Sequence, residues 1–168
     1  MLKLTLKIIF CSFLISIFMV EDSFARKVKV PDATIVVVKT VETVDSGIYR
    51  DGQDIPLMVV MPVKIKGKVI IESGATAVGV VDFSKEADYA GIPGELSIAV
   101  KYVKAVDGTS IRLSGYFMDK GNSQIGGTVA VALLCPLAII NRGGEGTIRS
   151  GSELRAMTIG NYMIDVGQ

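Results

Sequence analysis

Short hydrophobic runs, many of them β-branched, recur along the chain and are separated by glycine, proline and aspartate. Runs of this length between turn residues are typical of β-strands. We therefore expect strands over 34–40, 57–65, 69–71 and 77–81.

The clearest local pattern is a hairpin over 95–117. Hydrophobic and polar residues alternate on both sides of Asp107-Gly108, which is a preferred dipeptide in tight hairpin turns. The inward positions predicted from this alternation are Leu96, Ile98, Val100 and Tyr102 before the turn, and Ile111 and Leu113 after it.

Other turns are expected where glycine follows a turn-forming residue. Asp51-Gly52 and Lys66-Gly67 mark two of them. Ile92-Pro93-Gly94 predicts a type II turn, because proline and glycine suit its two central positions.

One five-residue pattern occurs three times, at 30–34, 71–75 and 148–152. Each copy starts with a hydrophobic residue, continues with residues common in turns, and precedes a hydrophobic stretch. The pattern predicts a recurrent corner at which one strand ends and the chain restarts on a neighbouring strand. Because the spacings are unequal, it does not indicate a solenoid.

The N-terminus has the layout of a secretory signal peptide. Lys3 and Lys7 precede an uncharged stretch over 8–20, and small residues lead to a cleavage site between Ala25 and Arg26. We expect a signal peptide over 1–25 and a single β-rich domain over 26–168. An uncleaved membrane anchor is the alternative, although 13 residues (8 to 20) are short for a bilayer.

The segment 125–140 carries no charge and has Pro136 near its middle. It is either a buried helix or pair of core strands, or an exposed hairpin or short helix that meets a membrane or partner. The glycines on both sides suit an element that can swing. The candidate contact surface is Val129, Val131, Leu133, Leu134, Cys135, Leu137 and Ile139.

The amino-acid composition excludes some catalytic mechanisms and argues against one class of partner. The 168 residues include 18 glycines but no histidine or tryptophan, and the formal net charge is +1. Without histidine, Ser-His-Asp and Cys-His catalysis are excluded. The balanced charge argues against a nucleic-acid partner. Removal of 1–25 would leave Cys135 as the sole cysteine, so no intramolecular disulfide is expected.

Two groups of side chains are candidates for a catalytic or binding site. Asp82, Glu86 and Asp88 alternate, but the loop lacks the glycine and the final glutamate of an EF-hand. These carboxylates leave a small hydrolase as an alternative. Tyr102, Tyr116 and Phe117 could share one sheet face and bind carbohydrate. We assign no catalytic, cofactor or metal residue and expect that the protein is not an enzyme.

A resemblance adds to this picture. The corner at 71–75, the Gly91-Ile92-Pro93-Gly94-Glu95-Leu96 turn and the Ala105-Val106-Asp107-Gly108 hairpin resemble a widespread group of exported bacterial β-rich proteins. Glu72-Ser73 and Arg149-Ser150 stand where that group tends to have proline, so these corners are less rigid. The resemblance implies fold and export, and it carries over no catalytic residue.

Together these patterns predict an all-β fold, a small barrel or sandwich with an apolar helical or hairpin insertion near 125–140. The expected function is that of an exported, periplasmic or envelope-associated protein that acts by binding or assembly through this apolar element. Its partner would be a protein, a membrane surface or another copy of the chain. No cofactor is expected.

Overall fold

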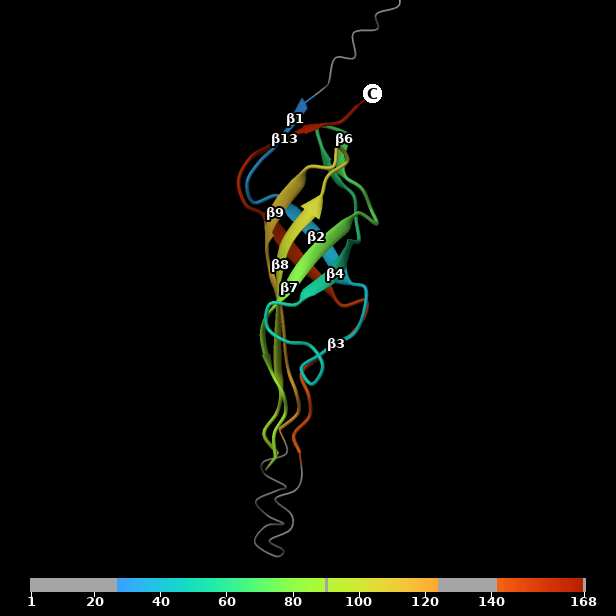
Figure 1. Ribbon diagram of the computed structural model, residues 1–168. Helices are drawn as coiled ribbons and strands as arrows, with labels where there is room; N and C mark the ends of the chain where they lie inside the picture. The colour runs from blue at the N-terminus through green and yellow to red at the C-terminus, as the bar shows by residue number, and fades with distance from the viewer. Residues whose placement is uncertain (1–26, 90, 124–141, 168) are drawn as a thin grey trace, which may run out of the picture.

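The computed structural model describes residues 27–89, 91–123 and 142–167, and their regular elements are all strands (Figure 1). The expected all-β class is therefore confirmed. The strands are β1 (Lys27–Val30), β2 (Ile35–Thr40), β3 (Val44–Asp45), β4 (Asp54–Val59), β5 (Val63–Ile65), β6 (Lys68–Ile71), β7 (Thr76–Lys85), β8 (Glu95–Lys104), β9 (Ser110–Ser114), β10 (Tyr116–Lys120), β11 (Thr147–Ile148), β12 (Glu153–Thr158) and β13 (Tyr162–Asp165).

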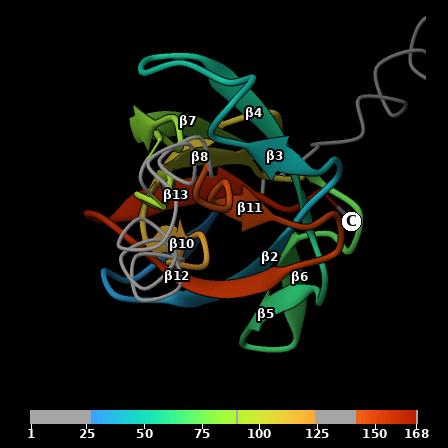
Figure 2. The same ribbon diagram turned by 90° about the horizontal axis from the view of Figure 1, so that it is seen from below.

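Six antiparallel strands close into a barrel, in the order β8-β7-β4-β2-β12-β9, because β9 also pairs with β8. The long strand β8 pairs with β9 through its second half and with β10 through its first half. Of the two predicted architectures, the barrel is the correct one. Three two-stranded sheets, β1-β13, β3-β11 and β5-β6, are added to it. In Figure 2 the barrel is seen from the end that carries β3 and β11.

The core follows the period-two alternation of the strands. In β2, Val36 and Val38 are fully buried and alternate with more exposed neighbours, and Ile55 and Leu57 do the same in β4. Because β-branched and aliphatic side chains pack well on a pleated sheet, this one-sided pattern drives barrel closure.

All three predicted corners are present. Each begins with a buried residue that ends a strand: Val30, Ile71 or Ile148. At each, the chain passes from a two-stranded sheet into the barrel. The fourth position has a positive φ in every copy, 58° at Ala33, 82° at Gly74 and 84° at Gly151.

The predicted hairpin is present as β8 and β9, with Gly108 at a φ of 83° in its turn. The burial of β8 departs from the predicted alternation in two ways. Ser97 and Ala99, which lie between the predicted inward positions, are buried as well, and the alternation changes phase at Lys101. Between the pairs Val78–Tyr102 and Gly79–Val100 the register shifts, so Lys101 is an extra residue. As a result Val103 is buried and Tyr102 faces outward. A β-bulge of this kind redirects every later side chain.

Two other strand predictions need correction. The run 57–65 is not one strand, because the chain turns between Val59 and Val63 and forms β4 and β5. Strand β7 continues to Lys85, four residues beyond the predicted end of this strand at Val81.

The predicted insertion at 125–140 and the signal peptide at 1–25 lie outside the described residues and stay predictions. In the part of the chain that is described, no helix is long and apolar enough to cross a membrane.

Candidate functional site

The candidate site consists of the residues that flank the apolar segment and pack against one another, namely 92–94, 121–122 and 142–146. We call this part of the molecule the stem. The stem lies at the end of the barrel away from β1, β13 and β6 (Figure 1). Asn122 precedes 124–141 and Gly144 follows it, and Gly144 N donates a hydrogen bond to Asn122 O at 3.1 Å. Gly144 O accepts from Gly94 N, and Gly94 O accepts from Gly121 N, both at 2.9 Å. The chain therefore leaves and rejoins the barrel at one place.

Glycines make this close backbone packing feasible. A Cβ on Gly121 would collide with the carbonyl of Gly144, and one on Gly143 would collide with the carbonyl of Ile92. A Cβ on Gly94 would lie 2.5 Å from Ser46 Oγ. The flanking glycines were expected to let the segment swing. For Gly121 and Gly143 this expectation is wrong, because both allow close backbone packing that holds the stem in place.

The predicted type II turn at 92–94 is also wrong. A type II turn requires a positive φ at Gly94, and the glycines with positive φ do not include it. Gly94 is needed for space beside Ser46, not for an unusual backbone angle.

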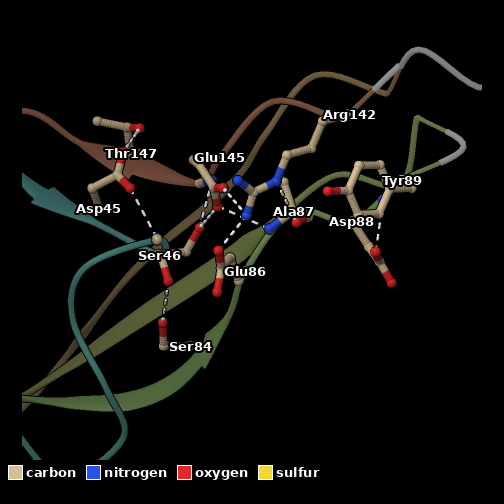
Figure 3. A network of polar contacts seen from close by, with 12 residues as sticks. Asp45, Ser46, Ser84, Glu86, Ala87, Asp88, Tyr89, Arg142, Glu145 and Thr147 are labelled. Carbon is tan, nitrogen blue, oxygen red and sulfur yellow. Dashed lines mark hydrogen bonds and ion pairs between the residues drawn. The ribbon is translucent and has the colours of Figure 1, made fainter. Parts of the chain in front are cut away.

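A network of side chains supports the stem from within (Figure 3). Ser46 is fully buried, donates to Glu145 Oε2 at 2.7 Å and accepts from Gly146 N at 3.0 Å. The same Oε2 accepts from Ala87 N at 2.9 Å. One carboxylate thus joins three segments that are far apart in the sequence: the loop after β3, the segment that follows β7 and the segment before β11.

Arg142, the first described residue after the apolar segment, completes the network. Its Nε donates to Ala87 O at 2.9 Å, and its guanidinium pairs with Glu86 and, at 3.3 Å, with Glu145 (Figure 3). Hydrogen bonding to Glu86 raises the pKa of Arg142 above its usual value. We call Ser46, Glu86, Ala87, Arg142, Glu145 and Gly146 the stem network.

The stem network is suited to holding a chain segment. Both oxygens of Glu145 have partners, and no buried side-chain nitrogen or oxygen in the described residues lacks one. A saturated network of this kind fixes geometry and offers no free group to a substrate.

The structure separates the three carboxylates considered for hydrolysis. Asp82 is exposed on β7, Glu86 pairs with Arg142 and Arg50, and Asp88 accepts from Tyr89 N at 2.7 Å. Among the described residues, no three His, Cys, Asp or Glu side chains could hold a metal ion.

The aromatic group is divided too. Phe117 is buried in the core, contrary to its predicted place on a binding face. Tyr102 and Tyr116 are exposed, and both line a surface hollow of about 490 Å³ at the junction of β8, β9 and β10. We call it the tyrosine hollow; Arg112, Lys101, Ser110 and Ser114 also line it.

The remaining predicted site residues lie outside the described residues. They are Ala25 and Arg26 at the cleavage site, and Val129, Val131, Leu133, Leu134, Cys135, Leu137 and Ile139 in the contact surface. Sequence reasoning missed the stem network, because Ser46 and Glu145 are 99 positions apart and belong to no motif.

Comparison with known proteins gives a distant likeness in fold. No family model matches the chain, and no curated protein matches its sequence. Among solved structures, the chain is similar to ComB10 of the Com type IV secretion system of Helicobacter pylori, with 12% identity and a TM-score of 0.47 over 88% of this chain and 95% of that one. An identity and a TM-score this low do not assign the chain to a family.

Proposed function

We propose that the protein is an exported component of the bacterial cell envelope and works by binding or assembly, not by catalysis. The apolar segment 125–140 is its contact element. The proposal is supported by the signal-peptide layout of 1–25 and by the absence of charge from sixteen consecutive residues (125 to 140). Uncharged stretches of that size mark interaction sites when they are not buried.

The observation that carries the proposal is the stem. A backbone hydrogen bond joins Gly144 to Asn122, and Arg142 contacts Ala87, Glu86 and Glu145 directly after the segment. A closed barrel that fixes both flanks of an uncharged segment at one end can present that segment without contributing it to its own core.

The test is deletion of 128–139. We expect the deleted chain to keep the barrel, seen as an unchanged circular dichroism spectrum and cooperative unfolding, and to lose membrane association or its oligomeric state. Met118→Asp is the matched control, because Met118 is 79% exposed on β10 and lies outside the segment. Unchanged membrane association together with an unchanged oligomeric state would overturn the contact role.

The tyrosine hollow favours a second candidate, binding of an envelope carbohydrate. Tyrosine rings stack on sugars, and the neighbouring Arg112 and serines offer hydrogen bonds. Tyr102→Ala with Tyr116→Ala should abolish retention on envelope polysaccharide, whereas Tyr89→Ala, an exposed tyrosine elsewhere, should not. Equal retention of all three proteins would remove this candidate.

A further inference from the structure

A second hollow, of about 450 Å³, lies among β1, β13 and the β5-β6 hairpin, at the end of the barrel opposite the stem (Figure 1). Lysines dominate its lining. Its six residues are Lys27, Val28, Lys29, Lys66, Lys68 and Met163, and we call it the lysine hollow.

The strand pattern explains why these lysines converge. In β1, Lys27 and Lys29 are exposed on one face, while Val30 on the opposite face is fully buried. The β5-β6 hairpin adds Lys66 from its turn and Lys68 from the first position of β6. Two elements about forty residues apart in the sequence therefore place four lysines around one space.

No acidic residue is among the described residues that line the hollow. Asp165 is the Cα partner of Lys27 in the β1-β13 pair, and its carboxylate accepts from Gly167 N at 3.2 Å. Across the described residues, none of the four lysines forms an ion pair. Like charges around one hollow repel each other, and a bound anion would relieve that repulsion.

Lys66 is an unusual choice for its position. Its φ is 51° and that of Gly67 is 78°, so both central residues of the turn are in the left-handed region. Two-residue turns of this kind favour asparagine, aspartate or glycine at the first position. The turn itself therefore gains nothing from lysine, and the side chain places a positive charge at the hairpin tip.

We propose that the lysine hollow binds the phosphate-bearing headgroups of an anionic membrane surface. Met163 is 58% exposed among the lysines, and a mixture of apolar and cationic side chains is typical of surfaces that lie at lipid headgroups. The four lysines supply the positive charge that phosphate groups of such headgroups would pair with.

The test compares binding of the chain, as the cell processes it, to vesicles of phosphatidylcholine with and without about one-third phosphatidylglycerol. Each lysine near an anionic surface contributes about fivefold to partitioning, so Lys29→Gln with Lys68→Gln should reduce binding to the anionic vesicles about 25-fold. Lys85→Gln with Lys101→Gln removes the same charge from exposed positions outside the hollow and should have little effect.

Lys66→Asn separates binding from folding. Asparagine tolerates the left-handed region better than lysine, so thermal stability should stay equal or rise while binding to anionic vesicles falls about fivefold. Labelling of lysine amines, measured by mass spectrometry, gives a second readout that does not depend on how the N-terminus is held. Anionic vesicles should slow labelling of the four hollow lysines but not of Lys85 and Lys101.

Three results would overturn the proposal. The first is equal binding to both kinds of vesicle together with equal labelling of the lysines. The second is an equal loss of binding to anionic vesicles in the hollow variants and the control variants. The third is protection of the four lysines by inorganic polyphosphate but not by anionic vesicles. The proposal does not depend on the segment 125–140. If the segment contacts the membrane, deletion of 128–139 should lower binding to both kinds of vesicle by a similar factor. The lysine-dependent difference between anionic and uncharged vesicles should remain, so the two ideas fail separately.

Discussion

Glycine is required in this protein for two different reasons, a positive φ angle at some positions and a lack of space for a side chain at others. Gly151 has a φ of 84° and would have nothing within 4 Å of an added Cβ, so it is needed for its backbone angle. Gly94 has no such angle but would collide with Ser46 and with Glu145 at 2.7 Å. Turn patterns in a sequence indicate the first kind, because the angle is local. The second kind depends on which distant residues come near.

Asp107 shows how a single side chain joins two parts of the fold. Its carboxylate accepts from Thr109 N at 2.9 Å within the β8-β9 turn, and from Asp165 N at 3.1 Å in β13. Burial raises the pKa of Asp107, but these backbone donors outweigh it, and the pKa is lower than usual.

Asp107→Asn should therefore lower the free energy of unfolding at neutral pH, by roughly 1 kcal/mol because the site is solvent-screened. The folded-state pKa lies below the unfolded value of about 3.9, so the stabilising contribution is full above that value. It is lost as the pH falls through the folded-state pKa. Chemical unfolding of both proteins between about pH 7 and pH 2 should show a difference that shrinks in the acid range. A difference independent of pH would contradict this.

At the scale of elements, local patterns were sufficient where the cause is local. The three corners and the β8-β9 hairpin were predicted because a turn residue and an alternating run specify them. Tyr102 was misplaced because the extra residue at Lys101 responds to pairing with β7, which lies outside the hairpin. The stem network was not predictable for the same reason. The stem network depends on tertiary contacts between Ser46, Ala87 and Glu145. The break after Val59 did have a local signal, because Pro62 lies between β4 and β5 and proline disfavours a continuous strand.

The stem network can be tested as one unit. Ser46→Ala leaves Gly146 N buried without its acceptor, which should destabilise the protein by about 1–3 kcal/mol. Glu145→Gln keeps the shape but removes the charge that faces Arg142. Because Ser46 and Glu145 share a hydrogen bond, the double variant should lose less than the sum of the single losses, by at least about 0.5 kcal/mol.

Denaturant unfolding of the four proteins measures this coupling. A control cycle combines Ser46→Ala with Ser73→Ala, since Ser73 donates to Val60 O elsewhere in the molecule. Strict additivity in the first cycle would mean that the network does not act together.

At the scale of the whole molecule, the barrel is closed unevenly. β7 and β8 pair over most of their length, whereas β9 and β12 pair only at Ser114–Met157 and Leu113–Thr158. Beyond these pairs, Ile159 N donates to Arg112 O at 2.9 Å, and Arg112 N donates to the Tyr162 hydroxyl at 3.0 Å. The β9-β12 seam is therefore the place where the barrel should open first.

Native-state hydrogen exchange tests this order of opening. We expect the amide of Ile159 to exchange by local opening, with a lower free energy than amides of the β7-β8 ladder, because fewer bonds must break to expose it. Tyr162→Phe removes the acceptor of Arg112 N and should speed exchange at Ile159 while leaving the β4-β7 amides nearly unchanged. If Ile159 instead exchanged only through global unfolding, as the slowest amides do, the seam would be as strong as the rest of the barrel.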